Sequence, residues 1–179
     1  KRIIMPKDIL FNKDALEKTL QGFNIAADAV AGTIGPKGGN VYFDTELMPE
    51  ITNDGATVAD KVHLQDRQLD AGAYIIRNVT AQTNDDAGDG TTTTAVLTQA
   101  LVQACIERPE NSNTIKQSLS LAGKEVLEKL AKTSTKLKKE DIAKVALISA
   151  EDETIAKLIA EIIEKLGDKA VINVEDSKT

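Results

Sequence analysis

Residues 84–97, NDDAGDGTTTTAVL, place carboxylates, glycines and hydroxyls directly ahead of an apolar helical pattern. A helix N-terminus offers free backbone N–H groups and the positive end of the helix dipole, so this stretch predicts an anion site. Glycines let a phosphate approach the backbone, and threonine hydroxyls add donors around its oxygens. Asp89 lies between two glycines, and a carboxylate that faces a phosphate needs a cation such as Mg²⁺ between them. The pattern therefore favours a nucleoside triphosphate bound with magnesium.

A simple capped helix is the structural alternative, since Asp and Thr are ordinary N-cap residues. Two further Gly-rich segments favour a site: TIGPKGGN at residues 33–40, and TNDGAT at residues 52–57, where Asp54 and Gly55 begin another helix. None of the three loops contains the Walker A pattern G-x-x-x-x-G-K-[ST], or G-x-G-x-x-G in a βαβ setting. Three such loops indicate a nucleotide pocket outside the P-loop and Rossmann classes.

The elements that must position these loops are mainly helical. Apolar residues at three- and four-residue spacings predict a helix over residues 13–33, which Gly35 and Pro36 should end. NVYFD at residues 40–44 and ITND at residues 51–54 predict a small hairpin, which we expect to pair with the termini of a neighbouring subunit because two strands alone are marginal in water. Further helices are expected over residues 56–60, 66–83, 91–106, 114–132, 139–148 and 153–166.

A last strand is predicted over residues 170–175, AVINVE. Buried backbone groups need hydrogen-bond partners, so this strand implies either an exposed edge or a pairing segment beyond the sequence. We therefore expect the natural chain to continue.

Composition narrows the class of protein. The chain has 179 residues, of which 41% are apolar and 3% aromatic, which indicates a globular chain with an aliphatic, largely helical core. A net charge of −6 without a Lys/Arg cluster argues against nucleic-acid and anionic-membrane partners. Cys105 is the single cysteine, which excludes a disulfide framework within the chain. His63, the single histidine, lies between two predicted helices without a Ser or Cys partner and is not expected to be catalytic.

Four segments together resemble one protein family. They are TIGPKGGNV, ITNDGAT, NDDAGDGTTTTAVL and the run that begins ISAEDETIAKLIAEIIEKLG, in this order. From about residue 7 to residue 177 the chain is similar to the N-terminal part of a group I chaperonin of the GroEL type. The resemblance implies a mainly α fold, with part of a multihelical equatorial domain and its small β-hairpin over residues 1–131. The first half of an α+β intermediate domain would follow over residues 132–179, with the apical domain and the C-terminal half absent.

The resemblance also implies a set of site residues. The nucleotide contacts of the family fall on Thr33, Ile34, Gly35, Pro36, Asn53, Asp89, Gly90, Thr91, Thr92, Thr93, Ile148 and Ser149. Asp89 matches the Mg²⁺ ligand, while Thr33, Asn53 and Thr92 match positions that hold K⁺. Asp54 corresponds to a carboxylate near the γ-phosphate that assists hydrolysis, and is the implied catalytic residue. The principal hydrolytic base of the family lies in the absent half of the intermediate domain.

Some residues depart from the family pattern. IERPENSN at residues 106–113 is shorter than the usual loop, and SAEDE at residues 149–153 is one residue short. Gly39 stands where an arginine is frequent, and Asn53 where a lysine is. These departures concern subunit contacts and domain coupling more than nucleotide binding. ITNDGAT also recurs in group II chaperonins, but the NVYFD hairpin and the run after ISA favour group I.

The function implied by the resemblance is ATP-dependent protein folding, with ATP, Mg²⁺ and K⁺ as cofactors. Subunits would form a homo-oligomeric double ring with a co-chaperonin lid and receive unfolded polypeptides through the apical domain, in a bacterial cytoplasm or an organelle matrix or stroma. ATP binding would turn a local phosphate contact into a ring-scale conformational change. The alternative is a ring-forming or partner-binding fragment without useful ATPase activity, and a phosphotransferase is a weaker third. Because the principal base is absent, the 179-residue chain alone is expected to be inactive.

Overall fold

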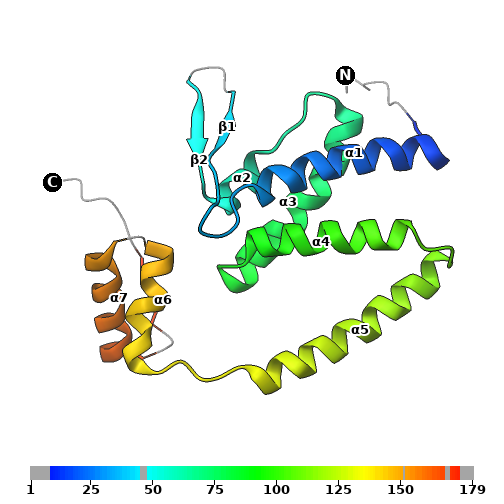
Figure 1. The fold of residues 1–179 in the computed structure, drawn as a ribbon. Coiled ribbons are helices and arrows are strands. Elements are labelled where there is room, and N and C mark those ends of the chain that lie inside the picture. The colour runs from blue at the N-terminus through cyan, green and yellow to red at the C-terminus, as the bar shows by residue number, and fades with distance from the viewer. Residues whose placement is uncertain (1–8, 45–47, 151, 168–169, 174–179) are drawn as a thin grey trace, which may run out of the picture. The chain divides into compact units, whose positions relative to one another are not determined.

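The structure, a computed structural model, describes residues 9–44, 48–150, 152–167 and 170–173. In order along the chain, the elements are α1 (Asn12–Ala31), β1 (Val41–Phe43), β2 (Glu50–Thr52), α2 (Gly55–Lys61), α3 (Arg67–Ala87), α4 (Thr91–Ile106), α5 (Ser112–Thr133), α6 (Lys139–Ala150) and α7 (Glu153–Leu166). The predicted fold class, mainly helical with a small hairpin, is confirmed (Figure 1). Two compact units divide the chain, Lys1–Asn111 and Ser112–Thr179.

The first unit is built on α1, α3 and α4, which pack against one another, with α2 against all three. Its core is aliphatic apart from Phe23, close to what the composition predicts, and consists of Phe23, Ala26, Ala27, Val30, Val58, Ala59, Val62, Ala73, Ile76 and Ala95. Two glycines let α1 and α3 approach closely. A Cβ on Gly22 would lie 1.7 Å from the backbone oxygen of Leu69, and a Cβ on Gly72 would lie 1.9 Å from that of Thr19. Only glycine fits at these two positions.

The hairpin pairs β1 with β2 in antiparallel register, with Tyr42 opposite Ile51. Val41 and Phe43 pack against the core of the first unit, so the alternating residues point away from it. Tyr42 and Ile51 are accordingly exposed, at 60% and 63%. The hairpin thus presents an apolar outer face.

Apart from the end of α3, the helix boundaries lie within two residues of the predictions. Helix α1 ends at Ala31, earlier than expected, because the N–H groups of Thr33 and Ile34 turn back to the carbonyls of Val30 and Ala31. Helix α3 runs to Ala87, past the expected end at residue 83. Its last turn is polar, so the spacing of apolar residues does not reveal it. Gly35 adopts φ +73°, the left-handed conformation expected of it.

In the second unit, α6 and α7 pack against each other. Helix α7 begins after Asp152, whose side chain accepts the N–H groups of Thr154 and Ile155, and ends at Gly167 with φ +87°. Helix α5 buries none of its residues. The unit begins at Ser112, whereas the predicted domain boundary at residues 131/132 falls near the end of α5. That boundary stays a prediction.

The strand predicted over residues 170–175 is wrong where it can be checked. Residues 170–173 are not in a strand, and residues 174–175 lie outside the described part. In the described part of the chain β1 and β2 pair only with each other, so the segment has no partner to supply a ladder. Among the described helices, none is long and apolar enough to cross a membrane.

Candidate functional site

The turn between α3 and α4 is built on two glycines. Gly88 and Gly90 adopt φ values of +70° and +87°, which places Asp89 at the apex of a tight reversal. The Asp89 side chain accepts the N–H of Gly90 at 2.6 Å. The N–H of Thr94 donates the first hydrogen bond of the helix, to the carbonyl of Gly90. The N–H groups of the three preceding threonines therefore have no acceptor within the helix. The start of α4 therefore presents N–H groups of the kind that bind anions, and anion binding there stays a prediction.

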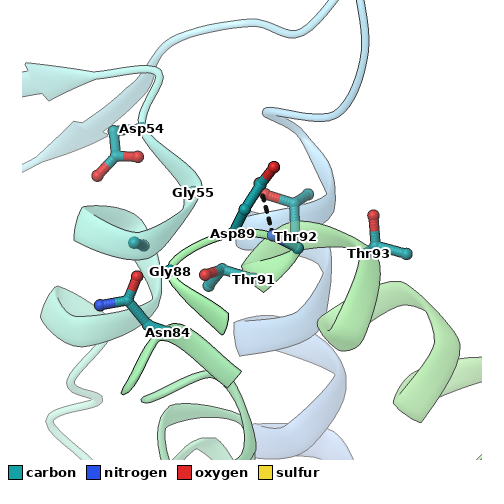
Figure 2. A pocket seen from close by; sticks show the side chains of 10 residues that line it. Asp54, Gly55, Asn84, Gly88, Asp89, Thr91, Thr92 and Thr93 are labelled. Carbon is teal, nitrogen blue, oxygen red and sulfur yellow. Dashed lines mark hydrogen bonds between the residues drawn. The ribbon is translucent and has the colours of Figure 1, made fainter. Parts of the chain in front are cut away.

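A cavity of about 180 Å³ lies at this turn. It is lined by Asp54, Gly55, Ala56, Asn84, Gly88, Asp89, Gly90, Thr91, Thr92 and Thr93. Figure 2 shows Asp54 at the start of α2 and Asp89 at the start of α4 bordering the same space. Two carboxylates and a row of hydroxyls thus reach one cavity from segments more than thirty residues apart.

Gly55 lets α2 start directly against α4. A Cβ at this position would lie 2.0 Å from the Thr92 hydroxyl oxygen and 3.0 Å from that of Thr33. Those two hydroxyl oxygens are 3.2 Å apart and hydrogen-bonded. The loop after α1, the start of α2 and the start of α4 therefore meet at one point, which brings together all three Gly-rich segments of the sequence.

Asp54 is the N-cap of α2. Its Oδ2 accepts the Thr57 hydroxyl at 2.6 Å and the Thr57 N–H at 2.8 Å. The Thr57 hydroxyl is the main cause that holds the pKa of Asp54 below its usual value, despite partial desolvation. The backbone N–H groups of Thr57 and Ala56 lower this pKa further. Asp54 is therefore a carboxylate at neutral pH and a weak base.

The structure brings together most of the predicted residues. Asp54, Asp89, Gly90, Thr91, Thr92 and Thr93 line the cavity, and Thr33 joins them through Thr92. Ile34, Gly35 and Pro36 lie in the exposed loop after α1, and Asn53 is exposed beside Asp54 without lining the cavity. Ile148 and Ser149 are exposed on α6, in the second unit. Their part in the site stays a prediction.

Four lining residues were missed: Gly55, Ala56, Asn84 and Gly88. The carbonyl of Asn84 accepts the N–H of Gly88 at 2.8 Å, so Asn84 lies one helical turn before the glycine that ends α3. Helical spacing counted back from Gly88 would have found it.

The donor set fits magnesium bound with a nucleotide. The described residues hold no group of three or more His, Cys, Asp or Glu side chains that could form a metal site of their own. Magnesium is usually held by one or two carboxylates together with waters and substrate phosphates, so Asp89, with or without Asp54, is sufficient for such a site.

A family model described as the TCP-1/cpn60 chaperonin family matches residues 26–178. The chaperonin gp146 from the bacteriophage EL 2 (Pseudomonas aeruginosa), solved in the presence of ATP-BeFx in two crystal forms, is 28% identical, with TM-scores of 0.75 and 0.76 over 87% and 88% of this chain. A group III chaperonin in the open state is 25% identical, with a TM-score of 0.72 over 87% of this chain. The matches span 28%, 29% and 32% of those longer chains. This chain belongs to the TCP-1/cpn60 chaperonin family.

Proposed function

We propose that this chain is the ATP-binding part of a group I chaperonin subunit that hydrolyses Mg-ATP to drive protein folding. The observation that carries the proposal is the cavity that Asp54 and Asp89 share with the threonine-rich start of α4. The likeness to a chaperonin solved in the presence of ATP-BeFx supports it. The label group I rests on the sequence motifs, namely the GPKG loop, the NVYFD hairpin and the run after ISA.

In this proposal the start of α4 binds the phosphates. Thr91, Thr92 and Thr93 offer N–H groups before the helical ladder and hydroxyls beside them. Asp89 would hold Mg²⁺, which when bound would supply charge neutralisation for the phosphates. Asp89 is held ready for this role by its hydrogen bond to the N–H of Gly90.

Asp54 has a different role in the proposal. A carboxylate whose pKa is held low by Thr57 is a poor acceptor of a proton but a good acceptor of a hydrogen bond. We assign it to orienting the water that attacks the terminal phosphate, with the principal base supplied by chain outside this sequence.

Potassium binding is proposed at Thr33, Asn53 and Thr92. The Thr33 and Thr92 hydroxyls are 3.2 Å apart and present hard oxygen atoms at the edge of the phosphate site. Ile34, Gly35, Pro36, Ile148 and Ser149 are proposed as further nucleotide contacts.

The wider assembly is also a proposal. Residues 1–131 would belong to an equatorial domain and residues 132–179 to an intermediate domain, in a homo-oligomeric double ring with a co-chaperonin lid. Unfolded polypeptides would bind to an apical domain outside this sequence, in a bacterial cytoplasm or an organelle. The exposed apolar face of Tyr42 and Ile51 suits packing of the hairpin against a neighbouring subunit, with which we expect the hairpin to pair.

A second candidate function is assembly without useful nucleotide binding. Its support is the apolar surface left exposed in the first unit, where Leu16, Leu97 and Leu101 are each more than half exposed. Such surface indicates contacts with other protein segments.

ATP turnover separates the two candidates. In the complete protein, Asp54→Ala should lower Mg-dependent phosphate release by about 10²-fold, the cost of a reacting group misplaced by about 1 Å, while Mg-ADP binding persists. The 179-residue chain alone should release no phosphate above background in the same malachite-green assay. Wild-type turnover in Asp54→Ala would contradict the assigned role, and absence of nucleotide binding by the complete wild-type protein would favour assembly alone.

A further inference from the structure

A partly buried ion pair on α3 contacts the end of α2, near the candidate site. The Arg77 guanidinium binds Asp70 with both ends of its fork, Nη1 to Oδ1 and Nη2 to Oδ2, each at 2.9 Å. Nη1 also donates to the carbonyl of Val62, the C-cap residue of α2. Asp70 Oδ1 in turn accepts the N–H of Leu64 at 2.9 Å. The Arg77 side chain is only 12% exposed.

This network fixes the far end of α2. The helix has seven residues, too few to hold a position without tertiary contacts. Val62 ends it and Leu64 follows, and both are tied to α3 by the network. At its other end, about 10 Å away at 1.5 Å per residue, the helix begins after Asp54. A short helix moves as a unit, so a shift at Val62 is transmitted to Asp54.

Val58, Ala59 and Val62 pack α2 into the core of the first unit, but beside the site a cavity interrupts the contact between α2 and α3. A second cavity, of about 230 Å³, is lined by Ala56, Asp60, Arg77, Thr80, Ala81, Asn84, Asp85 and Thr91. It shares Ala56, Asn84 and Thr91 with the candidate site. Ala56 and Asp60 of α2 line this cavity, and Arg77 of α3 lies in its wall.

We propose that Arg77 and Asp70 are positioning residues, which hold α2 against α3 so that Asp54 stays at the cavity that Asp89 also lines. Arg77 acts through Val62 and α2 and does not touch the nucleotide. The inference rests on the proposed function, in which Asp54 serves hydrolysis. Arginine is required because its planar fork binds a carboxylate in two places while a third N–H reaches the carbonyl, which a lysine ammonium cannot reproduce.

Enzyme kinetics of the complete protein test the proposal. Arg77→Met should lower kcat for Mg-ATP by at least about tenfold, because misplacing a reacting group by about 1 Å can cost about 10²-fold. KM and the affinity for Mg-ADP should stay within about twofold, since the phosphate contacts lie on α4. Counting Mg-ADP sites by calorimetry gives kcat per competent site, so loss of folded protein does not imitate the effect. The kcat per competent site of Arg77→Lys should lie between those of Arg77→Met and wild type. Arg67→Met, at an exposed arginine on the same helix, should match wild type.

Amide hydrogen exchange gives a readout that does not need turnover. Arg77→Met should speed exchange at residues 56–62 and leave α1 unchanged, whereas Arg67→Met should alter neither. If the complete wild-type protein hydrolyses ATP, an unchanged kcat per site in Arg77→Met overturns the proposal. If it does not hydrolyse ATP, the proposed function fails, and unchanged exchange in α2 overturns the positioning role separately.

Discussion

Helices α3 and α5 have nearly the same length, 21 and 22 residues, yet α3 is partly buried and α5 is exposed. Helix α3 buries Gly72, Ala73, Ile76 and Thr80 against the first unit. Helix α5 is amphipathic too, but it buries nothing, and Leu121 and Leu127 are 63% and 67% exposed. Periodicity shows which face of a helix is apolar, and only a packed neighbour turns that face into a core. The candidate site lies in the unit where such neighbours hold the loops in place.

Removing a large apolar side chain should change the free energy of unfolding by very different amounts in the two units. Phe23→Ala empties a fully packed position and should cost about 3–5 kcal/mol of unfolding free energy. Leu127→Ala, on α5, should change it by less than about 0.5 kcal/mol because the side chain is already in water. Urea denaturation of the 179-residue chain, followed by circular dichroism, measures both. Equal effects would show that α5 is as well packed as α1.

Adding a methyl group at a glycine should lower stability in α1 and raise it in α5. Gly22→Ala places a Cβ 1.7 Å from the backbone oxygen of Leu69, so α1 and α3 must separate, at a cost near the upper end of about 1–3 kcal/mol. Gly123→Ala on α5 meets nothing within 4 Å and should stabilise that helix by about 0.5–1 kcal/mol. Thermal unfolding of the two variants tests this, and a stabilised Gly22→Ala would refute the close α1–α3 crossing.

Acid should weaken the first unit through Asp70. The pKa of Asp70 is lowered from its usual value of 3.8, first by the Arg77 hydrogen bond. The ionised carboxylate therefore stabilises the folded chain at a pH above 3.8, and this stabilisation is lost as the pH falls through the lowered pKa. Asp70→Asn should therefore cost about 1.5–3 kcal/mol at neutral pH, the range for a hydrogen bond to a charged group. The difference from wild type should shrink below pH 4. Urea titrations at both pH values measure it, and a constant difference would contradict the ion pair.

The smallest effect is expected at the N-cap of α7. Asp152 accepts two backbone N–H groups there, and they lower its pKa. Because the ionised form is the one favoured in the folded chain, protonation of Asp152 as the pH falls through that lowered pKa should fray the first turn of α7. Asp152→Ala should fray it at neutral pH also, while Asp152→Asn should largely preserve it. Amide exchange of Thr154 and Ile155 reports this locally, and identical exchange in Asp152→Ala and wild type would rule it out.

The sequence predicts local features well. Helices that begin after Asp54, Gly90 and Asp152 could be placed because the signals lie within a few residues of each boundary. The close approach at Gly22 could not, because a sequence does not say which backbone a glycine will meet. The Arg77 network could not be predicted for the same reason. It joins Asp70 and Arg77, seven residues apart on α3, to the carbonyl of Val62 at the end of α2.

The candidate site shows the same division. From residue types alone, Asp89 between two glycines predicts a metal-assisted phosphate site, and that site stays a prediction. That the loops at Thr33, Asp54 and Asp89 meet depends on tertiary packing. Their shared Gly-rich composition and the family resemblance suggested one pocket, but neither gave its contacts. The strand predicted over residues 170–175 failed over residues 170–173 because β-propensity does not supply a partner.

Magnesium-dependent nucleotide binding tests the central claim most directly. Calorimetry should compare the complete wild-type protein with Asp89→Ala and with Asp86→Ala, a matched loss of an exposed carboxylate that does not line the cavity. Asp89→Ala should weaken Mg-ATP binding at least about 10- to 100-fold, the cost of losing even an outer-shell partner of a metal. It should also abolish the dependence on magnesium, while Asp86→Ala binds as wild type does. Wild-type, magnesium-dependent affinity in Asp89→Ala would contradict the assignment of this cavity as the nucleotide site.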